Sequence, residues 1–143
     1  MKLARVRIGT QVLLVEIDGD AGRPLAVDTM EPWFDPLRWY LANGADSSAP
    51  GMIAMSEVDL LAPLRSPQKI IAVAGNYRAH LAETNSPTPA EPVLASKSPS
   101  AIVGPGGAIP ISGASTSSVD YEGELAVIIG RRTKDVSPSD ALD

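Results

Sequence analysis

Apolar residues in the first part of the chain alternate or recur in ways that predict a β-hairpin and one helix. Residues 2–8 alternate apolar and polar side chains, a Gly-Thr turn signal follows, and residues 11–17 form a second apolar run. Residues 35–44 predict a helix, because Asp35 suits the cap position, a proline follows it, and Gly44 stands where a helix would end. This part of the chain therefore predicts a small α+β unit.

Shorter elements follow, and each ends at polar or glycine residues. Residues 69–74 are a continuous apolar run, which predicts a strand buried on both faces. A short helix is predicted from Asn76, which suits its cap, through Thr84. Further strands are predicted over residues 93–96 and 119–129, and the second of these is the longest strand-like run in the chain.

Proline and glycine divide the chain. A proline-rich stretch at residues 63–67 marks the expected boundary between a small N-terminal α+β domain, residues 1–62, and a second domain that begins at residue 63 and continues to residue 143. Within the second part, the sequence Gly-Pro-Gly-Gly at residues 104–107 predicts a tight turn. It matches neither dinucleotide nor Walker phosphate-binding patterns.

The composition limits the classes of protein that the chain can represent. It carries 12 Lys and Arg against 17 Asp and Glu, a formal net charge of −5, with no large basic cluster, which disfavours nucleic-acid binding. It has no cysteine, so disulfides, a thiol nucleophile and thiolate zinc sites are excluded. No apolar run approaches the roughly 20 residues of a membrane-spanning helix, and the N-terminus lacks the apolar core of a signal peptide. We expect a globular, cytoplasmic protein with no membrane association.

Three carboxylates share one face of the strand predicted over residues 119–129. Asp120, Glu122 and Glu124 alternate with apolar residues, and such neighbours lie roughly 6.5 to 7 Å apart along a strand. In a half-buried setting these like charges would repel one another, and a hard divalent cation such as Mg²⁺ relieves that conflict. The alternative is an edge strand whose polar face is simply solvated. The pattern alone supports both interpretations equally.

His80 is the single histidine of the chain, and it stands three residues before Glu83. On a helix the two side chains share a face, so the carboxylate could orient the imidazole as a general base. The alternative is a surface ion pair, which is the more frequent meaning of this spacing on a short helix.

Three further residues are candidates for substrate binding. Tyr77 and Arg78 follow Asn76 at the junction between the apolar strand and the helix, where an anion such as a substrate carboxylate would be favoured. Lys97 follows the strand at residues 93–96 and could pair with an acidic group of a substrate. The alternative for Lys97 is a solvated lysine at a strand end.

Taken together, these motifs resemble the fumarylacetoacetate hydrolase family. The resemblance is carried, in order along the chain, by IIAVAGNYRAHLAE at residues 70–83, PVLASKSPSAIVGPG at residues 92–106 and VDYEGELAVIIG at residues 119–130. The resemblance runs from about Pro67 to the last residue, which is more than half of the chain, and the three motifs within it have compatible spacing. The N-terminal residues are similar to the small unit that many bacterial members carry.

The resemblance implies a metal-dependent enzyme. Members of the family fold as a mixed β-sandwich roll, so the expected fold class is α+β and mainly β, and they usually work as homodimers. They bind Mg²⁺ (or Mn²⁺ or Ca²⁺) through a Glu-x-Glu strand and a later aspartate. Carried over here, Glu122 and Glu124 are the expected metal ligands, and His80 and Glu83 are the expected catalytic pair.

The reactions of the family share one kind of substrate. Members hydrolyse C–C bonds in acylpyruvates and other fumarylacetoacetate-type 1,3-diketo acids, or isomerise or decarboxylate related 2-oxo acids, through a metal-bound enolate. Both kinds of reaction need the same enolate, so the motifs leave them as alternatives.

The chain departs from the family pattern at its C-terminal side. The third metal ligand and a substrate-contacting lysine of the family fall downstream of the Glu-x-Glu motif, beyond residue 143. Two glutamates alone are a poor cage for Mg²⁺. We therefore expect a truncated form of the catalytic domain. The alternative function is a non-catalytic remnant that binds only a cation or a partner.

Overall fold

Short antiparallel strands make up most of the regular structure. The computed structural model describes residues 1–27, 40, 42–45, 50–111, 118–130 and 132–141. Within these residues the fold has seven strands, the helix α2 and two 3₁₀ helices, which confirms an α+β class that is mainly β. The chain divides into two compact units, Met1–Ala108 and Ile109–Asp143. The predicted domain boundary at residue 63 stays a prediction.

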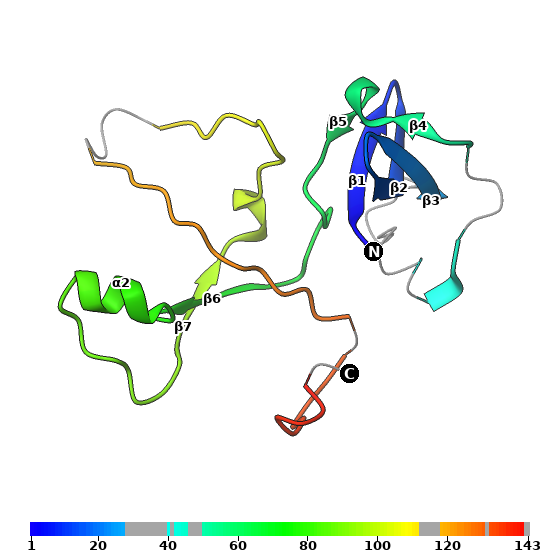
Figure 1. The fold of residues 1–143 in the computed structure, drawn as a ribbon. Coiled ribbons are helices and arrows are strands. Elements are labelled where there is room, and N and C mark those ends of the chain that lie inside the picture. The colour runs from blue at the N-terminus through cyan, green and yellow to red at the C-terminus, as the bar shows by residue number, and fades with distance from the viewer. Residues whose placement is uncertain (28–39, 41, 46–49, 112–117, 131, 142–143) are drawn as a thin grey trace. The chain divides into compact units, whose positions relative to one another are not determined.

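The first unit contains a five-stranded antiparallel sheet (Figure 1). Its strands are β1 (Leu3–Ile8), β2 (Gln11–Asp18), β3 (Ala21–Val27), β4 (Ile53–Ala54) and β5 (Asp59–Leu60), in the order β4-β3-β2-β1-β5. The predicted hairpin is confirmed, because Ile8 pairs with Gln11 across a turn in which Gly9 has a φ of 56°. The 3₁₀ helix η1 (Met55–Glu57) follows β4.

Strand β3 was missed by the sequence prediction because Gly22 and Pro24 interrupt its pattern. The register between β2 and β3 shifts so that Leu14 pairs with Ala26 but Val15 pairs with Pro24. Such an irregularity tolerates a proline, which cannot donate to the ladder.

The core of this sheet lies on both of its faces. Val6, Leu13 and Val15 form one buried cluster, and Leu14 packs with Leu25 and Ala26 in a second. Adjacent residues of β2 contribute to different clusters because side chains alternate across a strand. Burying each of these valine and leucine side chains stabilises the fold by about 1.5 to 3 kcal/mol.

A second, two-stranded antiparallel sheet is formed by residues of the first two sequence motifs, at residues 70–83 and 92–106. It consists of β6 (Ile70–Ala74) and β7 (Val93–Lys97), with α2 (Arg78–Glu83) between them in the chain and the 3₁₀ helix η2 (Pro99–Ala101) after them. The predicted positions of both strands are confirmed. The expectation that β6 is buried on both faces is wrong, because Ile71 is 51% exposed and Val73 is 37% exposed. An apolar run predicts a strand but does not by itself supply the layers that cover it.

Two features predicted from glycines, a helix end at Gly44 and a tight turn at residues 104–107, are present in the structure. The Gly44 N–H donates to the Tyr40 carbonyl at 2.8 Å and Gly44 has a φ of 80°, as at the end of a helix. Most of the helix predicted over residues 35–44 lies outside the described residues. The Gly107 N–H donates to the Gly104 carbonyl at 3.0 Å with Gly106 at a φ of 72°, which confirms the predicted tight turn.

The strand predicted over residues 119–129 is not formed. This segment of the second unit runs without helix or strand (Figure 1). Its apolar side chains are exposed, with Tyr121 at 92%, Leu125 at 85% and Val127 at 74%. A strand needs a hydrogen-bonded neighbour, and in the described part of the chain no segment pairs with these residues.

Candidate functional site

The turn between β6 and α2 leads the chain into the helix that carries His80 and Glu83. Gly75 has a φ of 64°, a conformation that glycine adopts without strain, and a Cβ atom there would lie 3.2 Å from the Pro89 Cγ atom. The predicted cap at Asn76 is wrong, since Tyr77 occupies the N-cap and makes no capping hydrogen bond with its side chain. Asn76 belongs to the turn that leaves β6, one residue too early to cap the helix.

Helix α2 is short and is anchored by one apolar side chain. It has six residues, of which only Leu81 is buried, at 8% exposure. A helix of this length is not stable by propensity alone, so its contacts with the rest of the unit hold it in place. His80 and Glu83 lie on its exposed side, with 67% and 81% of their side chains accessible.

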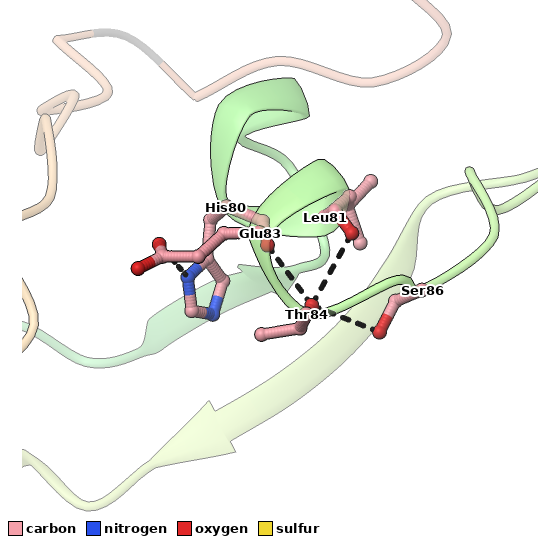
Figure 2. A network of polar contacts seen from close by, with 5 residues as sticks. All are labelled: His80, Leu81, Glu83, Thr84 and Ser86. Atoms are coloured by element: carbon pink, nitrogen blue, oxygen red, sulfur yellow. Dashed lines mark hydrogen bonds and ion pairs between the residues drawn. The ribbon is translucent and has the colours of Figure 1, made fainter.

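The predicted pairing of His80 with Glu83 is present in the structure. The His80 Nδ1 atom lies 3.8 Å from the Glu83 Oε2 atom, and both side chains project from the same face of α2 (Figure 2). This distance allows an electrostatic interaction but is too long for a hydrogen bond. An exposed imidazole beside a carboxylate can exchange protons with a molecule that reaches it from solvent.

A shallow depression of about 320 Å³ lies beside the start of α2. Its lining includes the polar side chains of Asn76, Arg78 and Glu91, with Leu81 and Pro89 as apolar neighbours. The sequence predicted Arg78 as an anion-binding residue, and the structure places it at this depression. The contribution of Thr88, Pro89, Glu91 and Pro92 was missed, because nothing in a proline-rich loop signals which helix it will face.

The other two candidates for substrate binding do not line the depression. Tyr77 is 46% exposed at the N-cap of α2. Lys97 is the exposed last residue of β7. Both belong to the same unit as the His80–Glu83 pair.

Glu122 and Glu124 belong to the second unit. Both are exposed, and within the described residues neither makes an ion pair or hydrogen bond. The Asp120 Oδ1 atom instead accepts a hydrogen bond of 2.8 Å from the Tyr121 N–H. The two glutamates, separated by one residue, offer the carboxylate oxygens that Mg²⁺ prefers, so their chemistry fits a metal ligand pair. Among the described residues no cluster of three or more acidic or histidine side chains forms a complete cage.

Comparison with known proteins finds a family match for residues 69–143. Residues 69–143 match the family model described as fumarylacetoacetate (FAA) hydrolase C-terminal. The chain is 41% identical over 102 residues to the mitochondrial oxaloacetate tautomerase fahd2 of Xenopus laevis, covering 71% of this chain and 32% of that protein. It is 34% identical to protein Rv2993c of Mycobacterium tuberculosis over 100% of this chain and 51% of that protein.

A solved structure shares the fold. An uncharacterised protein from Mycobacterium abscessus superposes with a TM-score of 0.53 at 28% identity, covering 81% of this chain and 40% of that one. The chain thus spans from about a third to about half of the length of these relatives.

These similarities define the class of the chain, a domain related to the C-terminal domain of fumarylacetoacetate hydrolase and to proteins named oxaloacetate tautomerases. The chain belongs to the fumarylacetoacetate hydrolase family. The matched residues include β6, α2, β7 and the Glu122–Glu124 segment. No helix among the described residues is long and apolar enough to span a bilayer.

Proposed function

We propose that the chain contributes to a divalent-metal-dependent active site that interconverts the keto and enol forms of a small 2-oxo dicarboxylic acid such as oxaloacetate. The observation that carries this proposal is the exposed His80–Glu83 pair, at 3.8 Å, within the region that matches the family. Relatives that are 41 to 45% identical over 91 to 102 residues are named oxaloacetate tautomerases, which favours this reaction over others of the family.

The proton transfer needs a base beside the substrate carbon. In this proposal the His80 imidazole removes a proton from the carbon next to the 2-oxo group while water gives a proton to the enolate oxygen, and in the reverse direction the imidazolium returns a proton to the carbon as the enol oxygen releases its proton to water. Glu83 orients the ring and stabilises the positive charge that the ring acquires. Because both side chains are largely exposed, a substrate can reach them without a large rearrangement.

The substrate carboxylates need cationic partners. Arg78 lines the depression beside α2, and a guanidinium binds a carboxylate with two parallel hydrogen bonds. Tyr77 and Lys97 are the further proposed contacts to the substrate.

Glu122 and Glu124 would hold Mg²⁺, or Mn²⁺ or Ca²⁺ in its place. A bound ion would supply a Lewis acid, whose effect on a 2-oxo group is to make the neighbouring C–H more acidic. The exposed glutamate pair supports this assignment, since it supplies carboxylate ligands with no competing partner in the described residues. We further propose a homodimer as the working form.

A C–C hydrolase is the second candidate, favoured by the name of the matched family model. In that case the His80–Glu83 pair would take a proton from water rather than from the substrate carbon. The two candidates differ in their products, because hydrolysis of an acylpyruvate releases two acids whereas tautomerisation changes no mass.

The test follows the ultraviolet absorbance of enol-oxaloacetate with the purified chain and Mg²⁺, and repeats the assay with an acylpyruvate. The proposal is supported if the enol band decays with the unsubstituted chain and does not decay with Glu122→Gln or with His80→Gln. Glu57→Gln is the matched control, since Glu57 is an exposed glutamate in η1. Calorimetric binding of Mg²⁺ without turnover of either substrate would instead favour a chain that only binds a cation.

A further inference from the structure

The C-terminal end of α2 is capped by Thr84, a residue that the proposed chemistry does not use. The Thr84 Oγ1 atom lies 2.9 Å from the His80 carbonyl oxygen, 3.3 Å from the Leu81 carbonyl oxygen and 3.0 Å from the Ser86 Oγ atom (Figure 2). The Thr84 N–H also donates to the His80 carbonyl, at 3.0 Å. Thr84 therefore makes two hydrogen bonds to the backbone carbonyl of His80, the proposed base.

The direction of these hydrogen bonds follows from counting protons. A hydroxyl carries one hydrogen, so Thr84 can donate fully to only one acceptor, and the His80 carbonyl is the nearest. A carbonyl oxygen cannot donate. The contact between Ser86 and Thr84 then requires the Ser86 hydroxyl to be the donor. The result is a directed chain from the Ser86 hydroxyl through the Thr84 hydroxyl to the His80 carbonyl.

Backbone hydrogen bonds complete this helix end. The Ser86 N–H donates to the Leu81 carbonyl at 2.8 Å, and Asn85 has a φ of 53°, the left-handed conformation that often ends a helix. The last carbonyls of any helix lack partners within it, and here those of residues 80, 81 and 82 accept hydrogen bonds from Thr84, Ser86 and Asn85 in turn.

This closure bears directly on the His80–Glu83 pair. Glu83 is the last residue of α2, so it is the first to leave when the helix frays from that end. The two residues are three positions apart, so their side chains are neighbours only while the backbone between them is helical. Leu81 is the single buried side chain of the helix, and the turn that follows it contains the hydrogen bonds of Thr84, Asn85 and Ser86.

We propose that Thr84 is a positioning residue for the His80–Glu83 pair, and that Ser86 holds the Thr84 hydroxyl in its donating direction. The proposal rests on the function proposed above for the pair. It assigns to Thr84 no contact with substrate: Thr84 acts by keeping Glu83 helical and so within reach of the imidazole.

The experiment uses the full chain and three substitutions. Thr84→Val keeps the branched shape and removes the hydroxyl, Ser86→Ala removes the donor to Thr84, and Thr84→Ser restores a hydroxyl. The matched control is Ser139→Ala, which removes an exposed hydroxyl that lies 2.7 Å from another, the Ser137 Oγ atom, in the second unit.

Two readouts are recorded for each variant. Because His80 is the single histidine, its ring proton signals in the NMR spectrum are unambiguous, and cross-peaks between the ring and the Glu83 side chain report the pair directly. Steady-state tautomerisation of oxaloacetate with Mg²⁺ supplies kcat and KM separately.

We expect Thr84→Val to lose the ring-to-Glu83 cross-peaks and to lower kcat by about fivefold with little change in KM, the factor that corresponds to one ordinary hydrogen bond. Ser86→Ala should show a smaller change in the same direction. Thr84→Ser and Ser139→Ala should keep both the cross-peaks and kcat. Unchanged cross-peaks in Thr84→Val would overturn the positioning role, whatever the activity. If the unsubstituted chain shows no turnover, the proposed function fails, and the cross-peaks still decide the role of Thr84.

Discussion

Gly75 lies against Leu81 where the chain leaves β6 for α2: a Cβ atom added to Gly75 would lie 3.6 Å from the Leu81 Cδ2 atom. The same Cβ atom would lie 3.2 Å from the Pro89 Cγ atom, closer than ordinary contact. The glycine thus lets the buried side of α2 and the loop after it approach the end of β6. The exposed side of the helix carries His80 and Glu83 as a consequence.

Substitution of Gly75 should therefore lower the free energy of unfolding by more than the backbone strain at this position alone. Gly75→Ala places a side chain at a φ of 64° and also crowds Pro89. We expect it to lower the free energy of unfolding by about 2 kcal/mol, of which the left-handed backbone accounts for about 1 kcal/mol. Urea unfolding followed by circular dichroism measures the change.

Gly106→Ala separates the two causes. Gly106 has a φ of 72° but would meet no atom within 4 Å, so its substitution carries the backbone strain alone. Equal losses of stability in the two variants would contradict the crowding at Gly75.

Leu81 should control the local stability of α2. Leu81→Ala removes the one buried side chain of the helix, and we expect the free energy of local opening to fall by about 2 kcal/mol, the lower end for buried leucines because the helix lies at the surface. Amide hydrogen exchange across residues 78–84 measures this opening. Leu94→Ala is the control, since Leu94 is 65% exposed on β7 and its loss should leave the exchange unchanged. Exchange rates that match in the two variants would mean that other contacts hold the helix.

Glu83 should matter for catalysis and hardly at all for stability. Its side chain is 81% exposed, and exposed ion pairs contribute little to folding. We expect Glu83→Gln to change the free energy of unfolding by less than about 0.5 kcal/mol and to lower kcat for oxaloacetate by about tenfold, because the ring loses its orienting charge. Glu57→Gln should change neither quantity. A kcat equal to that of the unsubstituted chain would identify the pair as a surface ion pair only.

Local features of the sequence predicted four of the seven strands that the structure describes, and the short helix α2. The hairpin of β1 and β2 follows from a glycine turn between two apolar runs, and β6 and β7 follow from compact runs bounded by turn residues. The proximity of His80 and Glu83 follows from helical spacing alone. These signals lie within a few residues of one another, so a single sequence contains them.

Features that depend on distant partners were not predictable. Residues 119–129 have the pattern of a strand, but a pattern does not provide the neighbouring strand that hydrogen bonding requires. Strand β3 forms despite Gly22 and Pro24 because its pairing with β2 accommodates them. Thr84 carried no signal, since contacts of a hydroxyl with nearby carbonyls leave no spacing to recognise.

The Glu122–Glu124 pair gives the sharpest test of the proposed metal site. Both carboxylates are exposed and lack partners in the described residues, so each should be available to a cation. We expect calorimetric titration to show Mg²⁺ or Mn²⁺ binding that strengthens when oxalate is present, and Glu122→Gln or Glu124→Gln to weaken it at least about tenfold, because each removes a charged ligand. Glu57→Gln removes one exposed carboxylate from the first unit and serves as the control for net charge. An equal, small weakening in all three variants would show that the cation responds to net charge alone, and the two glutamates would then be a solvated acidic segment rather than ligands.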